Sequence, residues 1–564
     1  MNSYIQLKKS NCKNCYKCIR HCPVKSISFS DHQARIIQDQ CILCGECFVA
    51  CPQNAKEIRN DVQLVKKLLA LGKPVYASIA PSFVANYTGC DIHTIETALK
   101  KLGFSGAEET ALGATIVKKK YEEMIASGNS KVIISSCCHT VNSLIQKYYP
   151  EALPYLANVI SPMQAHCLKI KEKYPEAYTV FIGPCISKKE EAELYPGIVD
   201  CALTFEELSA WLVEEAITIQ VAEKSDDLAE GRARLFPVTG GIIRSMNKPD
   251  ATYDYISIDG IEHCKSVLKN IIEGSLSHLF IEMSACVGSC TGGPAMDKDH
   301  RTPISDYIAV KSYSKKNDFE ITPPDATKMK KSFTYIGSNN QMPGSAAISE
   351  ILSKMGKATS EQELNCGSCG YNTCRDKAIA VYQGKADLTM CLPFLKEKAE
   401  NFSDNIIYNM PNGVIVMNEN LEVQQINRAA RQILNINNKL DILGCPVVRI
   451  LNPAAYLEVM NNGITIRDKL NYLAEYQKYI EETIIYDKVY HIIISILRDI
   501  TAEEKLKLQK EDTNKRTIEI TDNVIEKQMR VVQEIASLLG DTAAETKIAL
   551  SNLKETLKNE SPLY

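Results

Sequence analysis

The chain of 564 residues lacks long apolar runs, an excess of charge of either sign and an apolar N-terminal stretch. Without an apolar run of about 18 residues, no membrane span is expected. A net charge of −3 has none of the basic excess typical of nucleic-acid binding, so no nucleic-acid partner is expected. Residues 1–9 have no apolar core like that of a signal peptide, and we expect a cytoplasmic protein.

Cysteine stands out from this ordinary composition. The chain has 22 cysteines and only 9 histidines, and nearly all the cysteines precede residue 400. In a secreted protein such a count indicates disulfides, whereas closely spaced cysteines in a cytosolic chain indicate metal binding. The spacing of the cysteines is therefore the strongest indication of function in this sequence.

The first part of the chain repeats a motif of four cysteines, the last of which precedes a proline. In two-cluster ferredoxins, three cysteines of one copy and the fourth cysteine of the other copy hold each cluster. The repeat therefore predicts two [4Fe-4S] clusters; a pair of structural zinc sites, which also use four cysteines, is the alternative. The first set is Cys12, Cys15, Cys18 and Cys51, and the second is Cys41, Cys44, Cys47 and Cys22.

A third four-cysteine set lies on a glycine-rich loop and beyond a predicted helix. Its spacing resembles that of a small [4Fe-4S] domain found in several anaerobic redox proteins, and the resemblance covers residues 345–398. Zinc is again the alternative. The set consists of Cys366, Cys369, Cys374 and Cys391.

Three further cysteine loops each follow a short apolar run that predicts a strand. The runs are 132–134, 178–182 and 279–283. Because ligands bind beyond the carboxyl ends of strands in open α/β sheets, these loops are expected to converge on one site. Four thiolates from them would satisfy a cubane iron–sulfur cluster. They are Cys138, Cys185, Cys286 and Cys290.

These three loops resemble the signature loops of the [FeFe]-hydrogenase catalytic domain. The resemblance implies an H-cluster, in which the cubane is joined through Cys290 to a two-iron unit with CO, cyanide and dithiolate ligands. It also implies that Cys137 passes protons to the distal iron and that Lys188 holds a cyanide. An inert buried thiol is the alternative for Cys137. Other residues that the resemblance places around the two-iron unit are Pro81, Ser82, Phe236 and Ser284.

The chain also departs from that family. His139 stands where active enzymes usually have proline, and Gly183 and Ser284 stand where they usually have methionine. Smaller or polar residues there are expected to leave the two-iron unit more open, which favours a slow or biased enzyme. The acidic proton relay has only Glu122 or Glu123 as candidates, out of register, and the lysines at 118–120 are interpreted as a solvated helix face.

Between the second and third loops, Leu235–Val238 is predicted to form another strand. It leads into Thr239-Gly240-Gly241 at a helix start, and the family has a similar turn lining its cavity. The glycines would allow a close backbone approach there.

The last part of the chain is nearly free of cysteine. Its predicted β-β-α…β-β order resembles a PAS sensory domain, and an apolar stripe at 525–539 predicts helices that dimerise or pack on the body. We therefore expect a multidomain α/β and α+β protein. The predicted domains are a ferredoxin domain (1–60), an H-cluster domain (61–335), a small [4Fe-4S] domain (336–400), a PAS domain (401–500) and a helical segment (501–564).

Three functions are compatible with these predictions. The first is a regulatory [FeFe]-hydrogenase, with three [4Fe-4S] clusters and an H-cluster, that oxidises H2 or reduces protons. Its PAS output would signal to a kinase or phosphatase, and the chain would form a homodimer. The second is a catalytic hydrogenase that exchanges electrons with ferredoxin. The third is an iron–sulfur electron-transfer or assembly protein without a two-iron unit.

Overall fold

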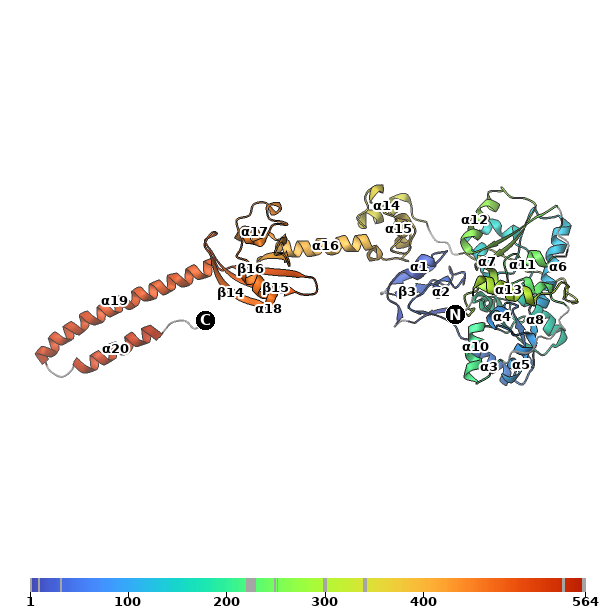
Figure 1. Ribbon diagram of the computed structural model, residues 1–564, viewed down its shortest axis with the longest axis horizontal. Helices are drawn as coiled ribbons and strands as arrows, with labels where there is room; N and C mark the ends of the chain where they lie inside the picture. Colours follow the sequence, from blue (N-terminus) through green and yellow to red (C-terminus); the bar gives the residue numbers. More distant parts are fainter. Residues whose placement is uncertain are drawn as a thin grey trace. The chain divides into compact units, whose positions relative to one another are not determined.

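The computed structural model (Figure 1) describes residues 3–8, 11–30, 33–219, 230–247, 250, 252–297, 302–337, 342–539 and 543–559. The chain forms two compact units, Met1–Phe394 and Leu395–Tyr564. Within the described ranges, no helix is both long enough and apolar enough to cross a membrane.

Two parallel sheets form the centre of the first unit. One has four strands in the order β6-β5-β8-β9, and the other has three in the order β10-β11-β7. Most of these strands are short apolar runs, as expected for parallel sheets with both faces covered. The strands are β5 (Val75–Ile79), β6 (Gly106–Glu109), β7 (Val132–Ile134), β8 (Tyr178–Gly183), β9 (Cys201–Thr204), β10 (Asp254–Asp259) and β11 (Leu279–Ser284).

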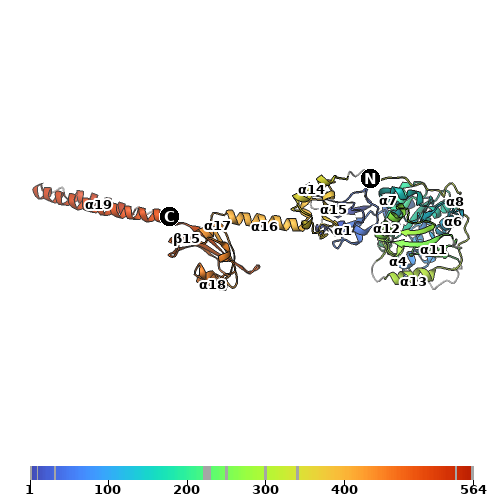
Figure 2. The ribbon, with the colours of Figure 1, turned by 90° about the horizontal axis from the view of Figure 1, so that it is seen from above.

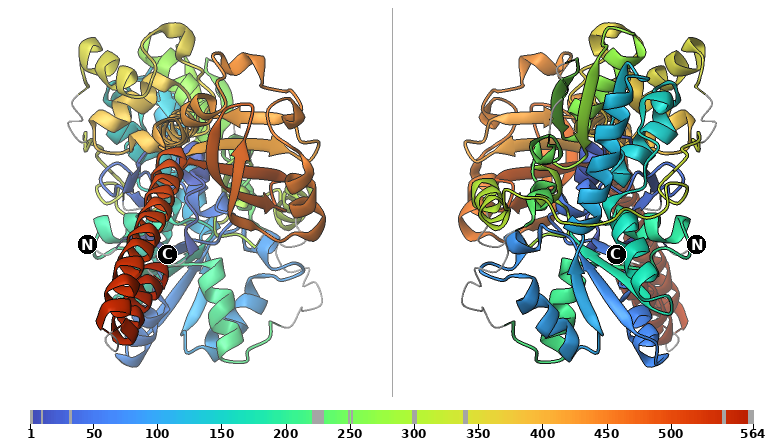
Figure 3. Two further views of the ribbon diagram at one scale, coloured as in Figure 1. Left: turned by 90° about the vertical axis from the view of Figure 1, so that its left-hand side faces the viewer. Right: turned by 90° about the vertical axis from the view of Figure 1, so that its right-hand side faces the viewer.

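Helices connect the strands and cover the two sheets (Figure 3). Local sequence sets where they begin: Ser161 and Gln164 form a capping box at the start of α8, with Pro162 in the first turn. The helices are α3 (Val62–Ala70), α4 (Phe83–Asn86), α5 (Ile92–Lys101), α6 (Ala111–Ser127), α7 (His139–Tyr148), α8 (Pro162–Lys173), α9 (Ser187–Leu194), α10 (Phe205–Glu214), α11 (Gly241–Ser245), α12 (Ile261–Ile272) and α13 (Pro303–Tyr313).

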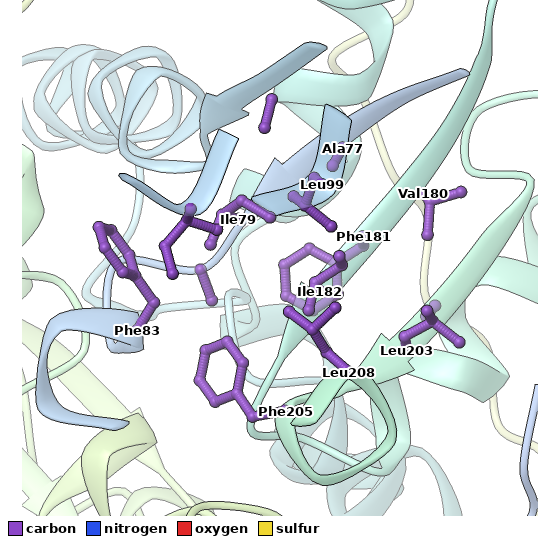
Figure 4. Close-up of a cluster of buried hydrophobic side chains, with 14 of the residues drawn as sticks. Ala77, Ile79, Phe83, Leu99, Val180, Phe181, Ile182, Leu203, Phe205 and Leu208 are labelled. Carbon is purple, nitrogen blue, oxygen red and sulfur yellow. The ribbon is translucent and has the colours of Figure 1, made fainter. Parts of the chain in front are cut away.

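The core of the four-stranded sheet is a continuous apolar cluster (Figure 4). Ile79 and Ile182, on neighbouring strands, pack with Phe83, Phe205 and Leu208 from the surrounding helices. Each such side chain contributes about 1.5–3 kcal/mol when it is fully buried. This packing fixes the carboxyl ends of β5 and β8, and it therefore also fixes the starting points of the loops that follow these two strands.

Residues 235–238 are not the strand that the sequence predicts. A 3₁₀ helix, η3 (Arg232–Leu235), ends there and is followed by successive tight turns, with Val238 N–H donating to the Leu235 carbonyl at 3.2 Å. Pro237 has no N–H to offer a neighbouring strand. The Arg234 guanidinium also anchors the segment, because it forms two hydrogen bonds of 2.7 and 2.8 Å to Glu109 at the end of β6.

This buried pair gives a test of the fold. Arg234 is 1% exposed and Glu109 5% exposed. Replacing Arg234 by Met leaves a buried carboxylate without its cation, so we expect the free energy of unfolding to fall by about 3–5 kcal/mol. Anaerobic urea unfolding, followed by the fluorescence of the chain's single tryptophan, Trp211, would measure it. Adding Glu109→Gln should restore much of the loss, and a loss below about 1 kcal/mol would contradict the assignment.

The N-terminal segment folds as two small antiparallel sheets with two short helices. It shares an apolar cluster with the loop around Tyr371, and the Lys25 ammonium donates to the Gly370 carbonyl at 3.0 Å. The elements of this part are β1 (Ile5–Leu7), α1 (Lys17–His21), β2 (Ile27–Ser30), β3 (Gln33–Ile36), α2 (Glu46–Val49) and β4 (Lys56–Ile58), followed much later in the chain by α14 (Ser345–Lys354), α15 (Cys374–Tyr382) and α16 (Leu392–Asn409).

The second unit contains a five-stranded antiparallel sheet in the order β13-β12-β16-β15-β14, with one apolar core. Its third strand and second helix, β14 and α18, were not predicted. The long α19 leaves the sheet as a single helix (Figure 2). An ion pair of 2.7 Å between Lys554 and Asp522 joins α20 to it. The elements are β12 (Gly413–Asn418), β13 (Val423–Ile426), α17 (Arg428–Ile433), α18 (Ala454–Asn462), β14 (Ile466–Leu473), β15 (Lys478–Asp487), β16 (Ile492–Asp499), α19 (Thr501–Leu539) and α20 (Ala543–Asn559).

Candidate functional site

A cavity of about 110 Å³ lies at the carboxyl ends of strands from both parallel sheets. The loop after β8 comes from the four-stranded sheet, whereas the loops after β7 and β11 come from the three-stranded sheet. The predicted convergence of three loops is therefore achieved between two sheets rather than along one. The predicted residues that line the cavity are Pro81, Ser82, Cys137, Cys138, Cys185, Lys188, Phe236, Ser284 and Cys290.

The fourth thiol of this group, Cys286, lies just outside the cavity wall. Burial raises its pKa, and the neighbouring sulfurs of Cys185, Cys138 and Cys290 raise it further. Cys290 lies deep in the protein but is accessible from the cavity. Four thiols thus come together at one place, and negative charge on all of them together requires a positively charged partner.

The thiol of Cys137 lies at the cavity wall and contacts Tyr121, a fully buried residue of α6. Its sulfur is 3.2 Å from the Tyr121 hydroxyl, which in turn accepts the Ser136 N–H at 2.9 Å. Burial raises the pKa of Cys137 to about 12, although the Tyr121 hydrogen bond opposes the shift. Cys137 is therefore a neutral thiol that faces the cavity and has a proton to exchange.

Lys188 brings a positive charge to the cavity. Its ammonium donates to the Cys137 carbonyl at 3.1 Å and pairs with the buried Glu191 carboxylate, which also accepts from Lys331 at 2.6 Å. Burial alone would lower the pKa of Lys188, but Glu191 outweighs it and the pKa is raised. The two lysines in turn hold the pKa of Glu191 well below its usual range, against the effect of burial.

Two polar atoms beside the cavity have no hydrogen-bond partner within the described part of the chain. They are the Ser82 hydroxyl and His139 Nδ1, both buried. The other ring nitrogen of His139 pairs with Glu190 at 3.0 Å. Buried polar groups nearly always have partners, so these atoms indicate a polar group bound in the cavity. The site therefore fits a bound group that accepts hydrogen bonds and that the cysteine sulfurs can coordinate.

Gly183 does not leave the cavity as open as its small size suggests. A Cβ at this position would lie 2.7 Å from the Phe181 ring and 3.0 Å from Ala80. Phe181 itself lines the cavity, so an aromatic ring of the same strand shields the side on which Gly183 lies.

The other predicted cysteine sets also come together. One small cavity is lined by Cys12, Cys15, Cys18 and Cys51, and another by Cys366, Cys369, Cys374 and Cys391. In the remaining set, burial raises the pKa of Cys44, and Cys22, Cys47 and Cys41 add to the shift. Among the described residues, no three His, Cys, Asp or Glu side chains are placed to hold a metal ion. The cysteines of the first and third sets thus surround a small cavity instead of meeting at one point.

The two out-of-register candidates for an acidic relay lie away from the cavity, and one lysine of the expected solvated face is buried. Glu123 is exposed and pairs with Lys120 at 2.7 Å, while Glu122 accepts the Asn247 N–H at 2.8 Å; neither lines the cavity. Lys118 is fully buried and pairs with Asp318, so the interpretation of a solvated face was wrong for this lysine. The buried face of α6 instead carries Tyr121. Its four-residue spacing from Val117 and Ile125 is a signal that sequence reasoning missed.

Glu282 is a second residue that the sequence analysis missed. It lies on β11, lines the cavity and is 3% exposed. Burial raises its pKa to about 7, although the Ile243 N–H, at 3.1 Å, favours the charged form. The carboxyl is therefore neutral in mildly acidic solution and ionised in alkaline solution.

Glu282 gives a prediction about pH and stability. Because its folded pKa lies above the unfolded value, its protonated form stabilises the fold below the unfolded pKa, and this contribution is lost as pH rises through about 7. Relative to Glu282→Gln, wild-type protein should lose roughly 2 kcal/mol of unfolding free energy between about pH 5.5 and about pH 8. Urea unfolding monitored by Trp211 would show it, and parallel pH profiles would contradict it.

Family models match the three cysteine-rich parts of the chain. Residues 73–254 and 244–294 match the iron-only hydrogenase large subunit, C-terminal domain. Residues 10–61 match a 4Fe-4S dicluster domain, and residues 362–393 match a putative Fe-S cluster model. Together with the cysteine-lined cavity, these matches define an iron–sulfur protein. Its α/β domain is similar to the iron-only hydrogenase large subunit, and the expected hydrogenase-like fold and 4Fe-4S ferredoxin domain are confirmed.

The curated relatives are distant. The chain is 27% identical over 365 residues to the periplasmic [Fe] hydrogenase large subunit of Nitratidesulfovibrio vulgaris, covering 51% of this chain and 85% of that protein. It is 26% identical over 294 residues to iron hydrogenase 1 of Clostridium pasteurianum, covering 42% of this chain and 51% of that protein. A variant of [FeFe]-hydrogenase HydA1 from Chlamydomonas reinhardtii aligns over 50% of this chain and all of that chain, with 16% identity and a TM-score of 0.38.

Proposed function

We propose that the chain is a hydrogenase of the iron-only type that serves as a hydrogen or redox sensor. The observation that carries this proposal is the shared cavity: a neutral Cys137 thiol, the Lys188 ammonium and the unpartnered Ser82 hydroxyl face a group of four thiols. A purely structural or electron-transfer cluster would need the four thiols but not the other three groups.

In this proposal each residue has a defined part. Cys138, Cys185, Cys286 and Cys290 would hold the cubane, and Cys290 would also join it to a two-iron unit in the cavity. When bound, the complete H-cluster supplies the chemistry that interconverts H2 with two protons and two electrons. Ser82 and Lys188 would donate hydrogen bonds to its cyanide ligands, with Pro81, Phe236 and Ser284 closing the wall around them. The Cys137 thiol would hold the proton that leaves or reaches the cavity.

Electrons would travel through the cysteine-bound clusters. The sulfur of Cys44, in the second ferredoxin-type set, lies close enough to Cys286 to raise its pKa. This proximity supports electron exchange between the cavity and the N-terminal segment. At the first and third sets the sulfurs line a small cavity, which favours a cluster of iron and sulfide over a single zinc ion on which four ligands converge.

The second unit would be the output. Its antiparallel sheet with α17 and α18 is compatible with a PAS domain, and α16 connects it in sequence to Cys391 of the third set. α19 exposes apolar side chains such as Ile520 and Val524, which a second copy of the helix could cover. A homodimer that signals to a kinase or phosphatase is therefore the proposed form. A catalytic hydrogenase that exchanges electrons with ferredoxin is the second candidate, and the match of residues 10–61 to a 4Fe-4S dicluster domain supports it.

The first test is an infrared spectrum of the anaerobically matured protein with and without H2. We expect sharp CO and cyanide bands that shift under H2, because the cavity fits the two-iron unit. Cys137→Ser should keep the bands and lower hydrogen turnover by about 100-fold or more, since it removes the thiol proton carrier. The absence of bands, alongside a control hydrogenase that matures normally, would leave an iron–sulfur electron-transfer protein.

The second test concerns signalling. If redox state passes to the output, hydrogen–deuterium exchange within α19 should differ between H2 and N2. Cys374→Ser, which removes one sulfur of the third set, should abolish this difference and leave the H2-dependent infrared shift intact. Equal exchange in α19 under the two gases, in a protein whose bands respond to H2, would favour the ferredoxin-linked catalyst instead.

A further inference from the structure

A row of hydroxyl groups leads from the cavity towards the protein surface. The Ser284 hydroxyl, at the end of β11, lies 2.8 Å from that of Ser289. Ser289 donates to the Thr239 hydroxyl at 3.5 Å, and Thr239 donates to the Asp259 carboxylate at 2.7 Å. Ser284 and Ser289 both line the cavity, whereas Asp259 is partly exposed at the end of β10. The row therefore joins the inside of the site to solvent.

The groups in this row are of the kind that can pass a proton. A hydroxyl donates one hydrogen bond and accepts others, so it can take a proton on its oxygen while it releases its own. Because the Asp259 carboxylate can only accept, Thr239 donates to it, and the Thr239 oxygen is left to accept from Ser289, so both hydrogen bonds point outward. The row ends at a carboxylate, which can bind a proton and release it to water. Asp259 is held in place by a further hydrogen bond of 2.8 Å from the Gly288 N–H. The link of 3.5 Å is the longest and would limit the rate.

The hydrogen-bonded route that begins at the Cys137 thiol is closed. From Cys137 it runs to the Tyr121 hydroxyl at 3.2 Å, and from there to the Ser136 hydroxyl at 3.3 Å. Ser136 donates to the Val159 carbonyl at 2.8 Å. A backbone carbonyl has no proton to hand on, so this route ends inside the protein. Among the described residues of this route, no carboxylic acid follows Cys137 that could carry its proton to solvent.

We propose that Ser284, Ser289, Thr239 and Asp259 form a proton wire between the cavity and solvent. This inference rests on the proposed hydrogenase function. For each proton that leaves, Ser284 accepts a proton from the cavity and gives its own to Ser289, which gives its own to Thr239. Thr239 protonates Asp259, and Asp259 releases the proton to water; no electron moves along the row. The wire depends on a serine at 284, where the resembling enzymes usually have methionine, which has no proton to pass.

The test uses the matured full-length protein and the matched pair Thr239→Val and Thr239→Ser. Valine keeps the shape of threonine but removes its hydroxyl, whereas serine keeps the hydroxyl. After rapid mixing with H2, a pH-indicator dye reports proton release, and infrared bands report the state of the cofactor. We expect Thr239→Val to slow proton release by about 100-fold, with unchanged CO and cyanide bands before mixing, and Thr239→Ser to stay close to wild type.

Asp259→Asn is the second variant. Asparagine can still accept the Gly288 N–H and hold the loop, but it cannot bind the transferred proton, so proton release should slow as in Thr239→Val. Wild-type rates of release in both Thr239→Val and Asp259→Asn, with normal infrared bands, would overturn the wire and leave the hydrogenase function standing. If wild-type protein itself shows no CO or cyanide bands after successful maturation, the proposed function fails, and the wire fails with it.

Discussion

The placement of sulfur in a buried environment is the constraint on which this structure depends. Four thiolates that meet away from water repel one another and are poorly solvated, and burial and neighbouring sulfurs both raise the pKa of Cys286. Only a strongly positive partner stabilises such a group, so the fold must hold the ligands apart around a space. Parallel strands do this because their carboxyl ends place loops at fixed positions. Here two sheets share the task, with Cys185 on one side and Cys286 and Cys290 on the other.

The positive charge of the site needs support of its own. Lys188 is buried beside the cavity, and its charge is maintained by Glu191, which in turn is shared with Lys331. A lone ammonium in this position would lose its proton, and a lone carboxylate would gain one. The three groups together keep one positive charge at the wall of the cavity, although none of them needs to touch water.

Spacing in the sequence was enough to predict which cysteines come together, because ligands of one cluster lie close in the chain or at successive strand ends. It was not enough where packing decides the outcome. Leu235–Val238 is apolar like a strand, yet Pro237 and the Arg234–Glu109 pair make it a series of turns. Lys118 resembles a surface residue, but Asp318, distant in sequence, pairs with it in the interior. Tyr121 and Thr239 matter to the site because the fold places them beside Cys137 and Ser289, and these contacts cannot be read from the sequence.

In the proposed function, the loop from Ser284 to Cys290 would couple proton movement to electron movement. Cys286 lies near Cys44 of the N-terminal segment, while Ser284 and Ser289, on either side of Cys286, belong to the hydroxyl row that ends at Asp259. Ser289 adopts a left-handed backbone conformation with φ of 56°, directly after Gly288 at 80°, and the turn leaves its hydroxyl within reach of Thr239. A strained turn is retained where the surrounding structure determines it. The same turn therefore sets the position of the proposed cluster ligand Cys290 and of Ser289 in the proposed wire. A substitution that moves the turn would alter both positions.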